Sequence, residues 1–125
     1  MATIVVVEDQ PDNLKLITAV LTAKGHRVLG LASGELLVAT LLAEQPPPQL
    51  VLLDIQLPGR DGYSVLADVK RIEGDHPWKV VALTAHAMPG DREKTLAAGF
   101  DGYLAKPIDV RSFPDEVARY ISPAR

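Results

Sequence analysis

The chain contains no cysteine among its 125 residues. This absence excludes disulfide bonds, thiolate metal sites and a cysteine nucleophile, and it is typical of proteins in a reducing cytoplasm. An excess of basic charge is also missing, since the formal net charge is −3 at pH 7 and no basic stripe or tail occurs. Nucleic-acid-binding proteins usually carry such a basic surface, so we expect no nucleic acid among the partners.

Long apolar runs are absent as well. None approaches the roughly 18–20 apolar residues that a membrane-spanning helix needs. Met1-Ala2-Thr3 leads directly into a strand-like segment and leaves no room for a signal peptide. We therefore expect a cytoplasmic protein without membrane contact. The length suits a single domain with one core, which we place at residues 1–125 with no output domain behind it.

Strand-like and helix-like segments alternate along the chain. The strand-like segments are apolar runs typical of strands buried on both faces, as in parallel sheets covered by helices. Five such β-α units predict an α/β fold with a doubly wound, five-stranded parallel sheet and right-handed crossovers. The predicted strands are residues 3–7, 27–31, 50–54, 79–83 and 102–105, and the predicted helices are 11–24, 34–44, 63–73, 89–98 and 109–121.

Two of the predicted helices are unusual. In the fourth, Leu96 is the only large apolar residue after Met88, so this helix should be weakly held and able to shift. In the fifth, Pro114 interrupts the apolar stripe, although proline is tolerated without distortion only in the first turn. Either this helix begins late, with Ser112 as its N-cap, or it is kinked.

Acidic residues stand at the ends of two apolar runs. Glu8 and Asp9 follow the first predicted strand, and Asp54 closes the third. The carboxyl ends of parallel strands share one edge of the sheet, where open α/β sheets bind ligands, so the three carboxylates should converge. Such a cluster needs a cation, and oxygen ligands suit Mg²⁺. Asp9 and Asp54 are short enough to bind directly, whereas Glu8 is better placed to act through water. Taken alone, the first pair could instead complement the dipole of the following helix.

Two further strand ends carry polar residues, Thr84 on the fourth strand and Lys106 on the fifth. Lys106 is a compact cation suited to a phosphoryl oxygen, and Thr84 offers a hydroxyl donor. With a carboxylate and Mg²⁺ they would form a site for phosphoryl transfer, where catalysis is mainly positioning and charge neutralisation. Asp54 would then become an aspartyl phosphate. Lys106 could also be a structural partner of Asp54 in the unphosphorylated state.

Four short motifs that carry these residues occur in order along the chain. They are Val6-Val7-Glu8-Asp9, Leu52-Leu53-Asp54-Ile55-Gln56-Leu57-Pro58-Gly59, Ala82-Leu83-Thr84-Ala85 and Leu104-Ala105-Lys106-Pro107. With them the chain resembles a two-component response-regulator receiver domain, CheY-like, over about residues 3–122. The segments 8–13 and 83–88 are most similar to receivers of hybrid kinases and of stand-alone DivK-like regulators. The resemblance implies the flavodoxin-like strand order 2-1-3-4-5.

The resemblance also implies a role for each site residue. Asp54 would accept a phosphoryl group from a sensor histidine kinase or a histidine phosphotransfer protein. Asp9, Asp54 and the backbone carbonyl of Gln56 would bind Mg²⁺, with Glu8 acting through water. Lys106 would contact the phosphate, and the peptide bond that follows it would be cis.

Further residues are implied in signalling. Thr84 and Tyr103 would form a switch pair, and Gln56 and His86 stand where variable residues tune dephosphorylation. The fourth helix, fifth strand and fifth helix would then present a changed surface to a downstream target protein, with the chain a monomer or a phosphorylation-linked dimer. Such a protein is a phospho-acceptor switch, not an enzyme, although it supports its own phosphorylation and slow autodephosphorylation.

Three alternatives use the same residues differently. An aspartate-nucleophile phosphatase of the haloacid-dehalogenase type would place a second aspartate two residues after Asp54, but Gln56 stands there. A flavodoxin-like cofactor binder needs a phosphate loop after the first strand, where Glu8 and Asp9 would repel the phosphate. A receiver that binds its partner without phosphorylation is the third.

Overall fold

The computed structural model describes residues 2–85 and 89–121. Its centre is a five-stranded parallel sheet with the strand order β2-β1-β3-β4-β5, which confirms the predicted fold class and order. Four of the five strands have the predicted bounds, and the fourth is one residue longer. The strands are β1 (Thr3–Val7), β2 (Arg27–Leu31), β3 (Leu50–Asp54), β4 (Lys79–Thr84) and β5 (Gly102–Ala105).

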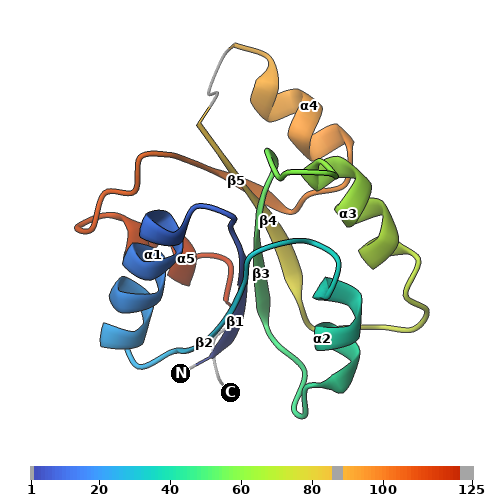
Figure 1. Ribbon diagram of the computed structural model, residues 1–125, viewed down its shortest axis with the longest axis horizontal. Coiled ribbons are helices and arrows are strands. Elements are labelled where there is room, and N and C mark those ends of the chain that lie inside the picture. The colour runs from blue at the N-terminus through green and yellow to red at the C-terminus, as the bar shows by residue number, and fades with distance from the viewer. Residues whose placement is uncertain (1, 86–88, 122–125) are drawn as a thin grey trace.

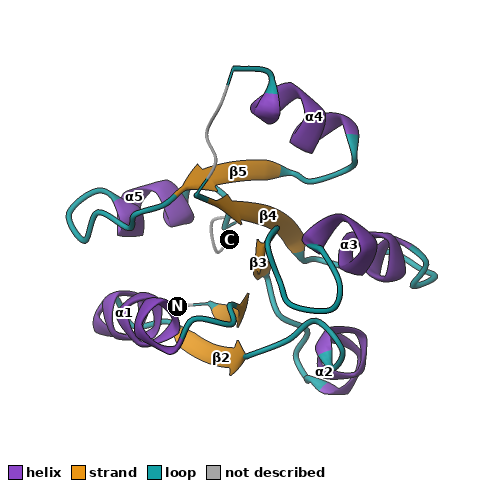
Figure 2. Ribbon diagram, turned by 45° about the horizontal axis from the view of Figure 1, so that its top comes forward, coloured by secondary structure: helices purple, strands orange, loops and turns teal. Residues whose placement is uncertain are grey.

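Helices cover both faces of this sheet. Helices α1 and α5 lie on one face, and α2, α3 and α4 lie on the other (Figure 1). Figure 2 shows the strands between these two helical layers. Within the described residues no helix is long and apolar enough to cross a membrane. The helices are α1 (Pro11–Ala23), α2 (Leu37–Ala43), α3 (Gly62–Lys70), α4 (Asp91–Ala97) and α5 (Phe113–Ala118).

The core consists of two apolar clusters, one beneath each helical layer. Side chains alternate along each strand, so Val5 and Val7 of β1 join the cluster under α2 and α3. Ile4 and Val6 join the cluster under α1 and α5. Strand β3 is buried along its whole length. The central strands therefore hold their carboxyl ends, where the acidic residues stand, on a closely packed base.

The helices are shorter than the periodicity predicts. Helix α2 begins at Leu37 because the segment before it packs closely on α3, where a Cβ on Gly34 would lie 2.4 Å from Val65 Cγ2. Helix α5 begins late, with Ser112 at the N-cap and Pro114 in the first turn. Proline needs no hydrogen-bond donor at that position, so the late-start alternative is confirmed.

Helix α4 has a small buried surface, as the sequence predicts. Thr95 is the only buried residue among its seven, and Leu96 is 39% exposed. Its contacts with Tyr63 of α3 include a hydroxyl pair with Thr95 at 3.2 Å and Lys94 Nζ over the ring, 5.4 Å from its centroid. With so few apolar contacts, α4 costs little to displace.

Candidate functional site

The three predicted carboxylates meet at the carboxyl edge of the sheet. Strands β1 and β3 pair in parallel with Val7 opposite Leu53, so Glu8 and Asp54 follow side by side. Glu8 is fully buried, Asp54 is 2% exposed and Asp9 is half-buried. One carboxylate oxygen from each of the three lies within 4.8 Å of the others. This spacing fits one hard cation with oxygen ligands at roughly 2.0–2.1 Å.

Lys106 lies between two of these carboxylates. Its Nζ atom is 2.8 Å from Asp54 Oδ2 and 2.8 Å from Glu8 Oε2. The side chain is 12% exposed, so the ammonium group is largely withdrawn from water. Its backbone N–H donates to the Thr84 carbonyl at 2.8 Å, and the peptide bond to Pro107 is cis, as expected. The structure thus places Lys106 as a shared ion-pair partner, the alternative noted for the unphosphorylated state.

The shared ion pair changes the acidity of its members. Burial raises the pKa of Glu8, and the neighbouring Asp54 carboxylate raises it further, although Lys106 and Asn13 oppose the change. Burial lowers the pKa of Lys106, but its hydrogen bonds to Asp54 and Glu8 outweigh burial and leave that pKa above its ordinary value. Lys106 therefore stays charged at neutral pH and offsets part of the negative charge.

Asn13 also belongs to this cluster, a role that its sequence context alone does not predict. Its Nδ2 atom donates to Glu8 Oε1 at 3.1 Å from the first turn of α1. Glu8 Oε1 also accepts from Lys106 Nζ at 3.1 Å, so Asn13 and Lys106 together fix the Glu8 carboxylate. One feature of the sequence could have pointed to Asn13: it is an amide residue in the first turn of a helix that begins at Pro11, just after the acidic pair.

The segment after β3 folds back beneath Asp54. The Gln56 N–H donates to Asp54 Oδ1 at 2.9 Å, and the Gly62 N–H donates to the Ile55 carbonyl at 2.7 Å. A Cβ on Gly62 would lie 2.7 Å from the Asp54 carbonyl oxygen, so only glycine fits. Asp54 is consequently held on Oδ1 by a backbone N–H and on Oδ2 by Lys106.

The predicted switch residues share a cleft beside the acidic cluster. Thr84 ends β4 and is buried, and Tyr103 on β5 is half-buried. Burial raises the pKa of Tyr103, and the negative charge of Asp91 adds to this effect. His86, predicted to tune dephosphorylation, lies outside the described residues. The cleft has a volume of about 130 Å³ and is lined by Ile55, Gln56, Tyr63, Thr84, Asp91, Lys94, Thr95 and Tyr103.

Known proteins are similar to this chain in sequence and in fold. The family model of the response regulator receiver domain matches residues 4–118. The signal transduction histidine-protein kinase BarA of Escherichia coli K12 is 40% identical over 118 residues, which is 94% of this chain but 13% of BarA. The polar-differentiation response regulator DivK of Brucella ovis is 36% identical over 122 residues, and the match covers 98% of both chains.

Solved structures agree with these matches. The receiver domain of the sensor histidine kinase PA1611 from Pseudomonas aeruginosa PAO1, with a magnesium ion coordinated in its active-site cleft, is 35% identical with a TM-score of 0.82 and covers 95% of this chain and 96% of that one. The chemotaxis response regulator CheY4 of Vibrio cholerae is 20% identical and supports the fold alone, with a TM-score of 0.86 over 97% of this chain and 99% of its own. The chain therefore belongs to the response regulator receiver domain family of two-component signalling.

Proposed function

We propose that this chain is a Mg²⁺-dependent phospho-acceptor switch in which Asp54 receives a phosphoryl group from a sensor histidine kinase or a histidine phosphotransfer protein. The observation that carries the proposal is the arrangement around Asp54. Lys106 Nζ lies 2.8 Å from its Oδ2 atom, and Glu8 and Asp9 bring two more carboxylates to the same strand edge. A buried carboxylate nucleophile beside a fixed cation and a metal-sized acidic cluster fits phosphoryl transfer.

The transfer step uses the Asp54 carboxylate as nucleophile. A new bond forms between one Asp54 oxygen and phosphorus while the phosphorus–nitrogen bond of the donor's phosphohistidine breaks. The imidazole of the donor leaves with the electron pair of that bond and takes up a proton. Before the step, the Gln56 N–H and the Lys106 ammonium group orient the carboxylate from two sides. Lys106 then pairs with a phosphoryl oxygen.

Asp9, Asp54 and the backbone carbonyl of Gln56 would hold Mg²⁺, with Glu8 contributing through water. The bound ion would neutralise the charge that accumulates on the phosphoryl oxygens. Glu8 has a further role in this proposal, because its ion pair keeps Lys106 beside Asp54 until the phosphoryl group arrives.

Thr84 and Tyr103 would convert phosphorylation into a change of surface. We expect the Thr84 hydroxyl to donate to a phosphoryl oxygen and Tyr103 to turn into the cleft that both residues line. Helix α4 buries only Thr95, so it can move with little cost, and α4, β5 and α5 would present a new surface. Gln56 and His86 would set the rate of slow autodephosphorylation.

The partners in this proposal are proteins. The likeness to BarA supports an upstream histidine kinase or phosphotransfer protein, and the likeness to DivK, covered over 98% of its length, supports action as a regulator of a separate target. The proposal also includes a cytoplasmic location, action as a single domain, and a monomeric or phosphorylation-linked dimeric state. Neither nucleic acid nor a membrane has a part in it.

Intact-mass spectrometry tests the proposal. With Mg²⁺ and acetyl phosphate, the chain should gain about 80 Da, the mass of one phosphoryl group. The Asp54→Asn variant and a sample with excess EDTA should show no gain. An unchanged mass for the wild-type chain, with acetyl phosphate and also with a panel of phosphorylated histidine phosphotransfer proteins, would overturn it.

A further inference from the structure

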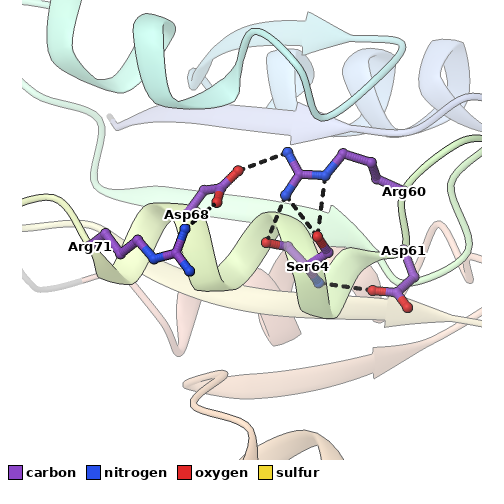
Figure 3. Close-up of polar contacts among 5 residues, drawn as sticks. All are labelled: Arg60, Asp61, Ser64, Asp68 and Arg71. Carbon is purple, nitrogen blue, oxygen red and sulfur yellow. Dashed lines mark hydrogen bonds and ion pairs between the residues drawn. The ribbon is translucent and has the colours of Figure 1, made fainter.

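A second polar network lies beside the site, on the loop between β3 and α3. Arg60 crosses the first turns of α3 with its guanidinium group between Ser64 and Asp68 (Figure 3). Its Nη2 atom is 2.7 Å from Ser64 Oγ and 3.1 Å from the Ser64 carbonyl oxygen, and Nε is 3.2 Å from Ser64 Oγ. Its Nη1 atom lies 2.7 Å from Asp68 Oδ2. We call Arg60, Ser64 and Asp68 the loop clamp.

The loop clamp holds the far end of a short closed loop. At its start, the Gln56 N–H binds Asp54 Oδ1. The Gly62 N–H binds the Ile55 carbonyl and closes the loop beneath Asp54. Arg60 precedes this closure by two residues and ties the same stretch to the side of α3. The Asp61 carboxylate caps the helix by accepting the Ser64 N–H at 2.8 Å.

The hydrogen bonds of Arg60 are charge-assisted and arranged as a fork, which constrains geometry more than a point charge does. The guanidinium group holds the pKa of Asp68 below its usual range. Arg71 offers an internal comparison, because its Nη1 atom contacts the same carboxylate at 3.3 Å from the C-terminal end of α3. Arg71 therefore shares the charge and the partner of Arg60 but ties down no loop (Figure 3).

We propose that Arg60 is a positioning residue, which fixes the β3–α3 loop on α3 and so holds the Gln56 backbone in place for Mg²⁺ at the acidic cluster. The inference rests on the proposed function, in which the Gln56 carbonyl is a metal ligand. The direction of the change in Mg²⁺ affinity when Arg60 is removed distinguishes this positioning role from an effect of its charge. The positive charge of Arg60 can only repel Mg²⁺, so removing that charge alone would leave Mg²⁺ binding unchanged or strengthen it. Losing the clamp weakens binding.

The test is a Mg²⁺ titration of the complete chain, in which the amide chemical shifts of Gln56 and its neighbours in NMR spectra report binding. We expect Arg60→Ala to weaken Mg²⁺ binding about twofold to fivefold, the upper range of a partly exposed ion pair. Arg60→Lys keeps the charge but loses the fork and should resemble Arg60→Ala. Arg71→Ala should bind Mg²⁺ like the wild type. Ser64→Ala should fall between, and adding it to Arg60→Ala should change nothing further.

Hydrogen exchange supplies a readout independent of metal. The Gly62 amide should exchange faster in Arg60→Ala than in Arg71→Ala, because the loop it closes is no longer tied to α3. Tighter Mg²⁺ binding by Arg60→Ala, or equal binding and exchange in the two variants, would overturn the inference. If the wild-type chain binds no Mg²⁺ while Gly62 exchange still separates the variants, the proposed function fails at the metal and the clamp remains as a loop tether alone.

Discussion

Replacing Lys106 by methionine removes a cation that two buried carboxylates share. Glu8 is fully buried and Asp54 is 2% exposed, and each lies 2.8 Å from the ammonium group. Removing one member of a buried ion pair costs about 3–5 kcal/mol, because the remaining charge stays buried. We take the lower end, about 3 kcal/mol, because Lys106 itself is 12% exposed at the sheet edge. This is a large part of the roughly 5–15 kcal/mol that stabilises a typical domain.

Urea unfolding in EDTA near neutral pH measures the loss, with far-UV circular dichroism and the fluorescence of Trp78, the only tryptophan, as probes. A loss of about 3 kcal/mol lowers the urea midpoint by about 1–3 M. The matched control is Lys70→Met, which removes an exposed lysine and should change stability by less than about 0.5 kcal/mol. Added Mg²⁺ should restore part of the loss if it binds the folded cluster.

The pH dependence has a definite sign. Burial and Asp54 raise the pKa of folded Glu8, and in Lys106→Met the opposing hydrogen bond from lysine is gone. A carboxyl group whose folded pKa exceeds its unfolded value favours the folded state at low pH and loses that contribution as pH rises through the folded pKa. The deficit of the variant should therefore be largest around neutral pH and shrink toward pH 5. A midpoint equal to that of Lys70→Met, or a deficit that grows on acidification, would refute this account of the cluster.

Three further changes test other parts of the structure. Asp54→Asn should raise the free energy of unfolding by about 1 kcal/mol in EDTA. The change removes one of three crowded negative charges and leaves Glu8 to pair with Lys106. A clear loss of stability in urea unfolding would contradict this. Gly62→Ala should cost about 1–3 kcal/mol, because its Cβ meets the Asp54 and Ile55 backbone. In Gly102→Ala the nearest atoms lie at the end of the Tyr120 side chain, which can move, so this change should cost less. The reverse order of thermal midpoints would be evidence against the closed loop. Burial lowers the pKa of His26, whose Nδ1 accepts the Ala2 N–H, so neutral His26 stabilises the fold above about pH 6.5 and this contribution disappears as pH falls through the lowered value. Between about pH 7.5 and 5 the wild type should thus lose more stability than His26→Asn, and equal losses in denaturant titrations would remove histidine from the explanation.

The sheet and the meeting of the carboxylates could be predicted from sequence because both depend on short-range pattern. An apolar run buried on both faces has few alternatives to a central parallel strand, and the parallel direction then brings Glu8, Asp9 and Asp54 to one edge. Helix ends were less predictable because tertiary contacts decide them. The segment from Gly34 lacks helical structure where it packs on Val65, a contact that no local pattern reports.

The side-chain partners in the site were the least predictable part. Asn13 reaches Glu8, and Arg60 reaches back to α3, only because particular rotamers and one loop path place them there. The residue type of Lys106 and its place at a strand end predicted contact with a phosphoryl oxygen and left pairing with Asp54 as an alternative. Lys106 pairs with both Glu8 and Asp54 because both carboxylates are buried beside it, and the sequence does not reveal the burial of individual residues.

The identity of the modified residue is the most direct test of the central claim. After incubation with Mg²⁺ and a phosphodonor, borohydride reduction converts an acyl phosphate to an alcohol, so the phosphorylated aspartate is recovered as homoserine. Peptide mapping by tandem mass spectrometry then locates that residue. We predict homoserine at position 54 and at no other carboxylate, and none when Mg²⁺ is removed. Conversion of Glu8 or Asp9 instead of Asp54, or none in a sample that has gained phosphoryl mass, would contradict the account.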